Sequence, residues 1–235
     1  MADVYFNGPS GRIEGKYYQS ENEKSPVALV LHPHPLYGGT MNNKVVYAAY
    51  KAFVKNEISV LRINFRGVGK SQGEYDGGLG ELTDAATALD WLQIKNPIAD
   101  EFIISGFSFG AWIALQLIMR RPEISNFIAI SPPVNKFDFA FLSPCPIPGM
   151  IVQGSQDSIV DEDSVVQLAD RLSKQKNIKV SYRSITGGDH FFRDKIDELE
   201  EVISEHLDHY LKNKTSTPIK SKSRSAKKLN KMLLE

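Results

Sequence analysis

The stretch at residues 102–112, FIISGFSFGAW, changes its pattern abruptly in the middle. It opens with a continuous apolar run that is typical of a buried strand, whereas residues 111–119 have helical spacing. Between the two lies GFSFG, residues 106–110, a G-x-S-x-G sequence centred on Ser108. A strand that passes directly into a helix needs a tight turn, and glycines two residues on either side leave room for it.

Such a turn gives Ser108 a particular place in an α/β fold. It lifts the hydroxyl above the carboxyl end of the sheet, where open α/β folds bind ligands. The following helix directs its first N–H groups at the same place, which favours a developing negative charge. Because the motif lies between a predicted strand and a predicted helix, we interpret Ser108 as a nucleophile rather than as part of a glycine-rich turn.

Apolar runs and helical patterns alternate along the chain from about residue 27. Strands are expected at residues 27–32, 58–65, 102–105, 125–131, 149–154 and 178–185, and helices at 42–56, 82–95, 111–121, 161–175 and 194–212. Strands that are apolar on both faces and separated by helices predict a parallel sheet covered on both sides. The turn signal NGPSG also predicts an N-terminal antiparallel hairpin, which makes the sheet eight-stranded and mostly parallel.

The charge of the chain is distributed unevenly. The net charge is zero over 235 residues, but residues 212–235 hold eight of the 28 Lys and Arg and only one of the 28 Asp and Glu. That leaves 20 bases and 27 acids in residues 1–211, which we expect to form one domain. The basic tail, rich in Ser, Thr and Lys, is expected to be disordered. A solvated tail is favoured over contact with an acidic partner, anionic lipid or nucleic acid.

The remaining global features indicate an ordinary globular protein, since 42% of the residues are hydrophobic and 24% charged. The sequence contains no stretch of 18 apolar residues, so no membrane span is predicted. The first 18 residues lack the basic and apolar regions of a signal peptide. The single cysteine, Cys145, has no internal disulfide partner. A cytoplasmic location is therefore expected, and the sequence does not indicate an oligomeric state.

A serine hydroxyl needs a base to become a nucleophile, and the expected base is a histidine oriented by a carboxylate. Of the five histidines, His190 follows the last predicted strand and should reach the carboxyl edge of the sheet. His206 and His209 lie in the closing helix beside Glu205 and Asp208, and we interpret them as solvated surface. His190 is therefore the predicted base.

The predicted acid is Asp157, which directly follows the strand at residues 149–154 in a polar loop. Asp161 is a distant second choice, because it lies closer to the next helix and suits a helix N-terminus. Asp189 adjoins His190, and adjacent side chains rarely form the required hydrogen bond.

The order Ser108, Asp157, His190, each on a loop after a strand, resembles that of the α/β-hydrolases over roughly residues 3–211. The stretches LHPHPLYGGTMNNKVV and NFRGVGKSQGEYDGGLGELTDA further resemble a compact bacterial subgroup of hydrolases, described as serine-aminopeptidase-like or dienelactone-hydrolase-like. The resemblance implies the α/β-hydrolase fold, with helices on both faces of the sheet and a minimal lid, and no cofactor.

The resemblance also implies an oxyanion hole made of two backbone N–H groups. One belongs to Phe109, the residue after the nucleophile. The other comes from the loop HPHPLYGG, in which Pro33 and Pro35 have no N–H to donate. Related hydrolases carry His-Gly-x-Pro here and donate from x, which matches His34, and Leu36 is the alternative.

Two other motifs suggest binding sites that we do not favour. The histidines of HPH lack a nearby acid or cysteine, so no metal is expected, and His32 is interpreted as an anchor of its loop. Residues 64–73, NFRGVGKSQG, do not fit a phosphate-binding pattern. Arg66 is expected to hold this loop in place, with a substrate contact left open.

The predicted function is two-step acyl transfer on a small or medium acyl ester. Only residues 132–149 separate two predicted strands where a larger cap would be inserted, so the site should be open. Four residues of this segment could form an apolar wall of the site or pack in the core, and the two roles are equally expected: Phe137, Phe139, Phe141 and Leu142. Two alternatives remain: an aminopeptidase-like serine peptidase, and a non-catalytic interaction module that works through its basic tail.

Overall fold

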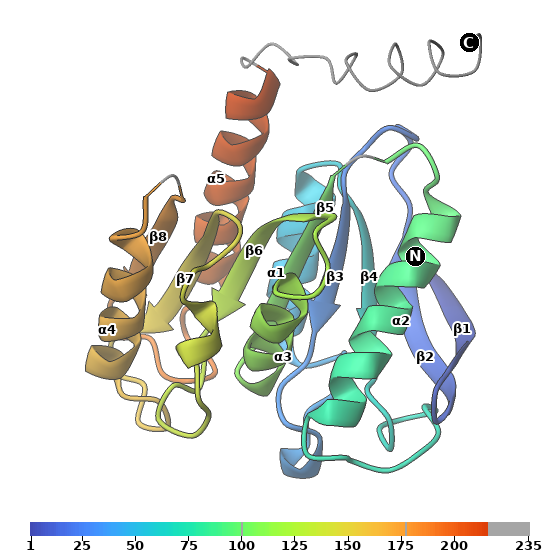
Figure 1. Cartoon of the computed structure of the whole chain (residues 1–235), viewed down its shortest axis with the longest axis horizontal. Helices are drawn as coiled ribbons and strands as arrows, with labels where there is room; N and C mark the ends of the chain where they lie inside the picture. The colour runs from blue at the N-terminus through green and yellow to red at the C-terminus, as the bar shows by residue number, and fades with distance from the viewer. Residues whose placement is uncertain (100, 177, 216–235) are drawn as a thin grey trace, which may run out of the picture.

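Eight strands form one sheet in a computed structural model that describes residues 1–99, 101–176 and 178–215. The strands are β1 (Ala2–Gly8), β2 (Gly11–Tyr18), β3 (Val27–Leu31), β4 (Ser59–Ile63), β5 (Phe102–Phe107), β6 (Ile124–Ile130), β7 (Gly149–Gly154) and β8 (Val180–Ile185). Their order in the sheet is β1-β2-β4-β3-β5-β6-β7-β8 (Figure 1). β1 and β2 form the predicted antiparallel hairpin, β2 joins β4 antiparallel, and all other neighbours are parallel.

Helices cover both faces of this sheet (Figure 1). They are α1 (Lys44–Lys55), α2 (Leu79–Lys95), α3 (Phe109–Ile118), α4 (Glu162–Ser173) and α5 (Ile196–Thr215), with short 3-10 helices at Pro35–Tyr37 and Ala140–Leu142. Apolar residues of α2, α3 and α4 pack on one face, and those of α1 and α5 on the other. The predicted mostly parallel sheet with helices on both sides is therefore confirmed.

The central strand β3 shows why both faces of the sheet are apolar. All five of its residues are buried, with Leu29 and Leu31 in the layer under α2 and α3, and Ala28 and Val30 in the layer under α1 and α5. Successive side chains of a strand point to opposite faces. Each face therefore meets its own layer of helices, which produces the continuous apolar runs of the sequence.

The elements begin and end within three residues of the expected bounds, and two of the differences affect the organisation of the chain. The helix expected at residues 42–56 spans Lys44–Lys55, because the side chain of Asn43 caps it by accepting from the N–H of Val45 at 2.9 Å. The closing helix α5 continues to Thr215, so residues 212–215 extend the folded domain instead of beginning the tail. The predicted disorder of the tail concerns residues 216–235, which lie outside the described part of the chain.

The topology brings the loops of interest to one edge of the sheet. The carboxyl ends of β3, β5, β7 and β8 all lie at this edge, since these strands are parallel members of one ladder. The segment between β6 and β7 contains one turn of 3-10 helix and no inserted domain. Within the described ranges, no helix is both long and apolar enough to traverse a bilayer.

Candidate active site

Ser108 occupies a strained turn between β5 and α3. Its backbone has φ 52° and ψ −117°, a conformation that costs a non-glycine residue free energy and is concentrated at functional sites. A Cβ on Gly106 would lie 2.2 Å from the carbonyl oxygen of Gly110, and one on Gly110 would lie 2.5 Å from that of Leu31. The two glycines of the motif are therefore required by close contacts between backbones.

His190 meets Ser108 from the loop after β8. Its Nε2 lies 3.2 Å from the Ser108 Oγ, although 82 residues separate the two in sequence. The imidazole is 5% exposed and packs against the rings of Phe107 and Phe191, with centroid distances of 5.1 and 5.2 Å. These contacts hold the ring beside the serine hydroxyl.

Asp157 orients this imidazole from the loop after β7. Its Oδ2 lies 2.7 Å from Nδ1 of His190, and its Oδ1 accepts from the N–H groups of Ile159 and Val160, both at 2.8 Å. Burial raises the pKa of Asp157, but the hydrogen bonds from His190 and from these N–H groups outweigh it and leave the pKa below its usual value. A carboxylate at this distance from Nδ1 favours the tautomer with the proton on Nδ1, so that Nε2 faces the Ser108 Oγ as an acceptor.

Gln153 is a member of this site that sequence reasoning missed. It is fully buried near the end of β7, and its Nε2 donates to Asp157 Oδ2 at 2.9 Å and to the carbonyl of Val160 at 3.0 Å. The signal available was a single polar residue inside the apolar strand GMIVQG. Gln153 completes the set of donors around the carboxylate, so that Asp157 accepts four hydrogen bonds.

The two other acids considered have separate roles. Asp161 caps α4, where its Oδ2 accepts from the N–H of Ser164 at 3.1 Å. Asp189 accepts from the backbone N–H groups of Phe191 and Arg193 through its Oδ1, at 3.1 and 3.0 Å. Neither has a hydrogen bond to the His190 ring among the residues that the structure describes.

The loop after β3 supplies the second group of predicted residues. The side chain of His34 accepts through Nδ1 from the N–H of Leu36 at 3.3 Å, and its Nε2 lies 3.1 Å from the Tyr75 Oη. Burial lowers the pKa of His34, which favours the neutral ring. Since Nδ1 accepts, the single proton of that ring lies on Nε2 and points at Tyr75, another residue that sequence reasoning missed.

The hydrogen bond from Leu36 to His34 distinguishes the N–H groups considered for the oxyanion hole. The N–H of Leu36 is engaged by His34 Nδ1. Phe109 is the first residue of α3, so its N–H lacks an intrahelical partner, and within residues 1–215 as described neither it nor the N–H of His34 donates to a protein acceptor. The rings of His34 and Phe109 pack together with centroids 4.9 Å apart, which places the two residues side by side.

His32 and Arg66 hold the neighbouring loops. His32 is fully buried, with Nδ1 2.6 Å from the carbonyl of Pro33 and Nε2 accepting from the N–H of Phe65 at 3.0 Å. Both ring nitrogens are therefore occupied by backbone groups, and neither is available to a metal. Arg66 forms hydrogen bonds with both carboxylate oxygens of Asp84, at 3.0 and 2.8 Å, which confirms its structural role.

The four apolar residues of the segment after β6 divide between wall and core. Phe137 stacks on Trp112 at 4.2 Å and packs edge-on against Phe109 at 6.0 Å, so it lies next to the nucleophile turn. Phe139 and Leu142 are buried in the core, at 4% and 0% exposed. Phe141 stacks on Phe139 at 6.0 Å and is half-buried.

The interpretation of His206 as solvated surface is wrong. This side chain is largely buried between α5 and the sheet, and its Nε2 lies 3.0 Å from Oδ1 of Asn126 on β6. The neighbouring acids indicated an exposed face, but the helix turns His206 inward, between them. His209 is exposed, as expected.

The fold, with its strained serine turn at the carboxyl edge of a mostly parallel sheet, defines an α/β-hydrolase. Proteins of similar sequence and structure support this class. The chain is 61% identical to an uncharacterized protein of Rickettsia prowazekii over 88% of this chain and 89% of the other. It is 48% identical to an Agrobacterium tumefaciens α/β-hydrolase of unknown function, with a TM-score of 0.88 over 90% and 97% of the two chains. A Xanthomonas campestris serine hydrolase without a lid is 30% identical, with a TM-score of 0.80 over 89% and 94%.

The model of the X-Pro dipeptidyl-peptidase (S15) family matches residues 12–143. The chain belongs to this family, within the α/β-hydrolase superfamily. The matched region contains the loop after β3 and the Ser108 turn, whereas Asp157 and His190 lie beyond it.

Proposed function

We propose that the chain is a carboxylesterase-like hydrolase in which Ser108, His190 and Asp157 act as a catalytic triad. The observation that carries the proposal is the continuous path from Ser108 Oγ to His190 Nε2 at 3.2 Å and from His190 Nδ1 to Asp157 Oδ2 at 2.7 Å. A serine is activated when a base lies within hydrogen-bond reach of its hydroxyl and a third group orients that base.

The mechanism follows from the positions of the protons. Ser108 Oγ attacks the ester carbonyl carbon while His190 Nε2 accepts its proton, and Asp157 stabilises the resulting imidazolium. His190 then gives that proton to the leaving alkoxide as the carbon–oxygen bond breaks, which leaves an acyl-serine. Water, deprotonated by His190, attacks this acyl group and releases the carboxylic acid with Ser108 restored.

The oxyanion of each tetrahedral intermediate needs two donors. We assign the N–H groups of Phe109 and His34, because both lack a protein acceptor in the described structure and lie next to Ser108. The N–H of Leu36 is the weaker candidate, since it already donates to the His34 ring. Each donor of this kind typically contributes about 3–4 kcal/mol to the stability of the transition state.

Small and medium acyl groups fit the surroundings of Ser108 best. The segment between β6 and β7 adds a short 3-10 helix where other hydrolases insert a cap. Phe137 and Trp112 offer an apolar surface beside Phe109, suited to a short aliphatic or aromatic acyl group. We also propose a cytoplasmic location, which suits a chain whose single cysteine is buried and free.

Labelling with a fluorophosphonate probe tests the nucleophile. The full-length protein should label at one site, and Ser108→Ala should not label, because the probe bonds only to an activated serine. Ser105→Ala serves as the matched control, since Ser105 lies in the same strand but is buried beneath the turn. Equal labelling of the wild type and Ser108→Ala would exclude Ser108 as the nucleophile.

A peptidase is the second candidate, because the matching family is named after X-Pro dipeptidyl-peptidase. The same triad would serve, but a peptidase also needs a group that binds the amino terminus of its substrate. The wild type should hydrolyse p-nitrophenyl esters of short acids much faster than aminoacyl or X-Pro p-nitroanilides. Release of nitroaniline with esters left intact would favour the peptidase.

A further inference from the structure

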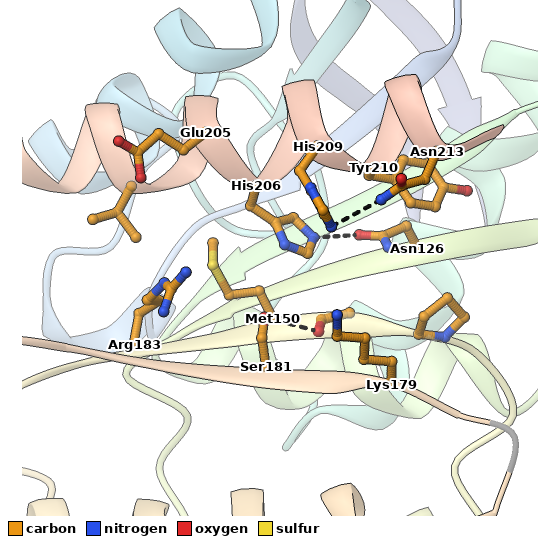
Figure 2. A pocket seen from close by; sticks show the side chains of 13 residues that line it. Asn126, Met150, Lys179, Ser181, Arg183, Glu205, His206, His209, Tyr210 and Asn213 are labelled. Carbon is orange, nitrogen blue, oxygen red and sulfur yellow. Dashed lines mark hydrogen bonds between the residues drawn. The ribbon is translucent and has the colours of Figure 1, made fainter. Parts of the chain in front are cut away.

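A cavity of about 750 Å³ lies between α5 and the amino-terminal halves of β6, β7 and β8 (Figure 2). Ser108, Asp157 and His190 all follow the carboxyl ends of their strands, so this cavity lies at the opposite edge of the sheet. Its volume is within the range of pockets that bind small molecules. It is therefore a candidate binding site separate from the proposed active site.

One face of α5 forms the roof of the cavity. Val202, His206, His209 and Asn213 line it at spacings of three and four residues, which places them on one side of the helix. The last turns of α5 extend beyond the amino ends of the strands (Figure 1). The cavity occupies the space that this helix and the strands enclose as they diverge.

The wall of the cavity contains the amide side chain of a buried asparagine. Asn126 is 1% exposed, and its Oδ1 lies 3.0 Å from Nε2 of His206 (Figure 2). Burial lowers the pKa of His206 to about 4, so the neutral ring uses Nε2–H to donate to Asn126. The NH2 group of Asn126 donates to no acceptor among the described residues. The NH2 group of Asn126 is therefore available to an acceptor on a ligand in the cavity.

Two cations border the same space. Lys179, just before β8, and Arg183, within β8, form no ion pair with any residue that the structure describes. Glu205 is the one acid among the described lining residues, and Figure 2 shows it on α5, across the cavity from Arg183. With His206 neutral, the two cations Lys179 and Arg183 outnumber the single acid Glu205, so the lining carries a net positive charge and an excess of hydrogen-bond donors. It suits a ligand that carries an oxyanion.

Apolar side chains also line the cavity. Met150, which is 1% exposed, and Pro148 contribute from the sheet side and Val202 from α5. We propose that this cavity binds a small organic carboxylate, with its charged end toward Asn126 and the cationic rim and its apolar body against Met150 and Val202. The proposal is independent of the function assigned to Ser108.

Titration of the full-length protein with 4-phenylbutyrate, followed through the ring resonances of its histidines, tests the site. The resonances of His206 and His209 should shift in a saturable way, whereas those of His190 should not. Arg183→Gln should raise the Kd about tenfold, or about 1.4 kcal/mol, because the variant loses a hydrogen bond to the charged carboxylate. The neutral analogue 4-phenylbutyramide should bind less tightly than the acid.

Arg120→Gln is the matched control, an exposed arginine after α3 and outside the cavity, and it should leave the Kd unchanged. Both replacements are at exposed positions, so neither should disturb folding. The proposal is overturned by shifts confined to His190, by equal affinity for acid and amide, by an unchanged Kd in Arg183→Gln, or by the lack of saturation at millimolar carboxylate.

Discussion

At the scale of single residues, the hydrogen bonding of the candidate site depends on which ring nitrogen of each histidine carries the proton. Asp157 accepts four hydrogen bonds, and one of them fixes the proton of His190 on Nδ1. His34 is fixed in the opposite tautomer, because its Nδ1 accepts from Leu36. The two histidines therefore have different hydrogen-bonding roles, and His190 is the one whose Nε2 faces the Ser108 hydroxyl as an acceptor.

His32 makes the stability of the protein depend on pH. Complete burial lowers its pKa to about 4, against about 6.5 in the unfolded chain. The unfolded state therefore binds an additional proton between pH 6.5 and 4, so the free energy of unfolding should fall as the pH falls through this window, by about 3 kcal/mol from His32 alone. Above pH 6.5 the residue is neutral in both states and contributes no pH dependence.

Urea unfolding at a series of pH values measures this slope, and the ring resonance of His32 reports its protonation. His206, whose pKa is also lowered to about 4, acts in the same direction, so His206→Gln should flatten part of the slope. The exposed His209 provides the comparison, and His209→Gln should leave the slope nearly unchanged. A His32 ring that titrates near pH 6.5 would contradict the prediction.

At the scale of elements, the junction of β5 and α3 depends on two glycines. In Gly106→Ala the new Cβ would meet the backbone of Gly110 at 2.2 Å, so the strand and the helix would have to separate. We expect a loss of about 3 kcal/mol in the free energy of unfolding, since overpacked sites typically cost about 1–3 kcal/mol and this contact involves backbone only. Fluorophosphonate labelling at Ser108 should also be lost.

Gly77 offers a control with a different kind of strain. It has φ +62°, and a Cβ there would meet nothing within 4 Å. Gly77→Ala should therefore lose only about 1–2 kcal/mol, from the left-handed backbone, and keep its labelling. Chemical denaturation of the two variants measures the difference. Similar losses, or a Gly106→Ala protein that labels normally, would show that the junction is more adaptable than its contacts indicate.

At the scale of the whole molecule, α5 connects the two edges of the sheet. It starts after the loop that carries His190, packs against α1, and ends at the cavity on the far side. Residues 212–215 belong to this helix, so a truncation that tests the basic tail should begin at residue 216. The catalytic proposal and the interaction-module alternative differ in what that truncation does.

Removal of residues 216–235 should leave the Tm and the turnover of a p-nitrophenyl ester unchanged, because the proposed triad and its supports lie within residues 1–215. A chain that ends at Glu205 is the matched comparison. It removes the fully buried Leu207 and the bond between His206 and Asn126, so its Tm should fall markedly. Loss of turnover in the shorter truncation would favour a working role for the tail.

The pattern of the sequence determined the architecture and the choice of candidate catalytic residues. Runs that are apolar on both faces predicted a covered parallel sheet, and position after a strand singled out Ser108, Asp157 and His190, because parallel strands end at one edge. Only the tertiary structure brought the three together. It also added Gln153 and revealed the burial of His206.

These last features depend on neighbours that are distant in sequence. Periodicity reports which side of an element is apolar, but not which side chain of another element fills the space beside it. His206 is buried because β6 places Asn126 under α5, 80 residues away. The His34 ring likewise meets the Tyr75 hydroxyl, 41 residues away, at 3.1 Å. Local pattern fixed the elements, and long-range packing decided which groups meet.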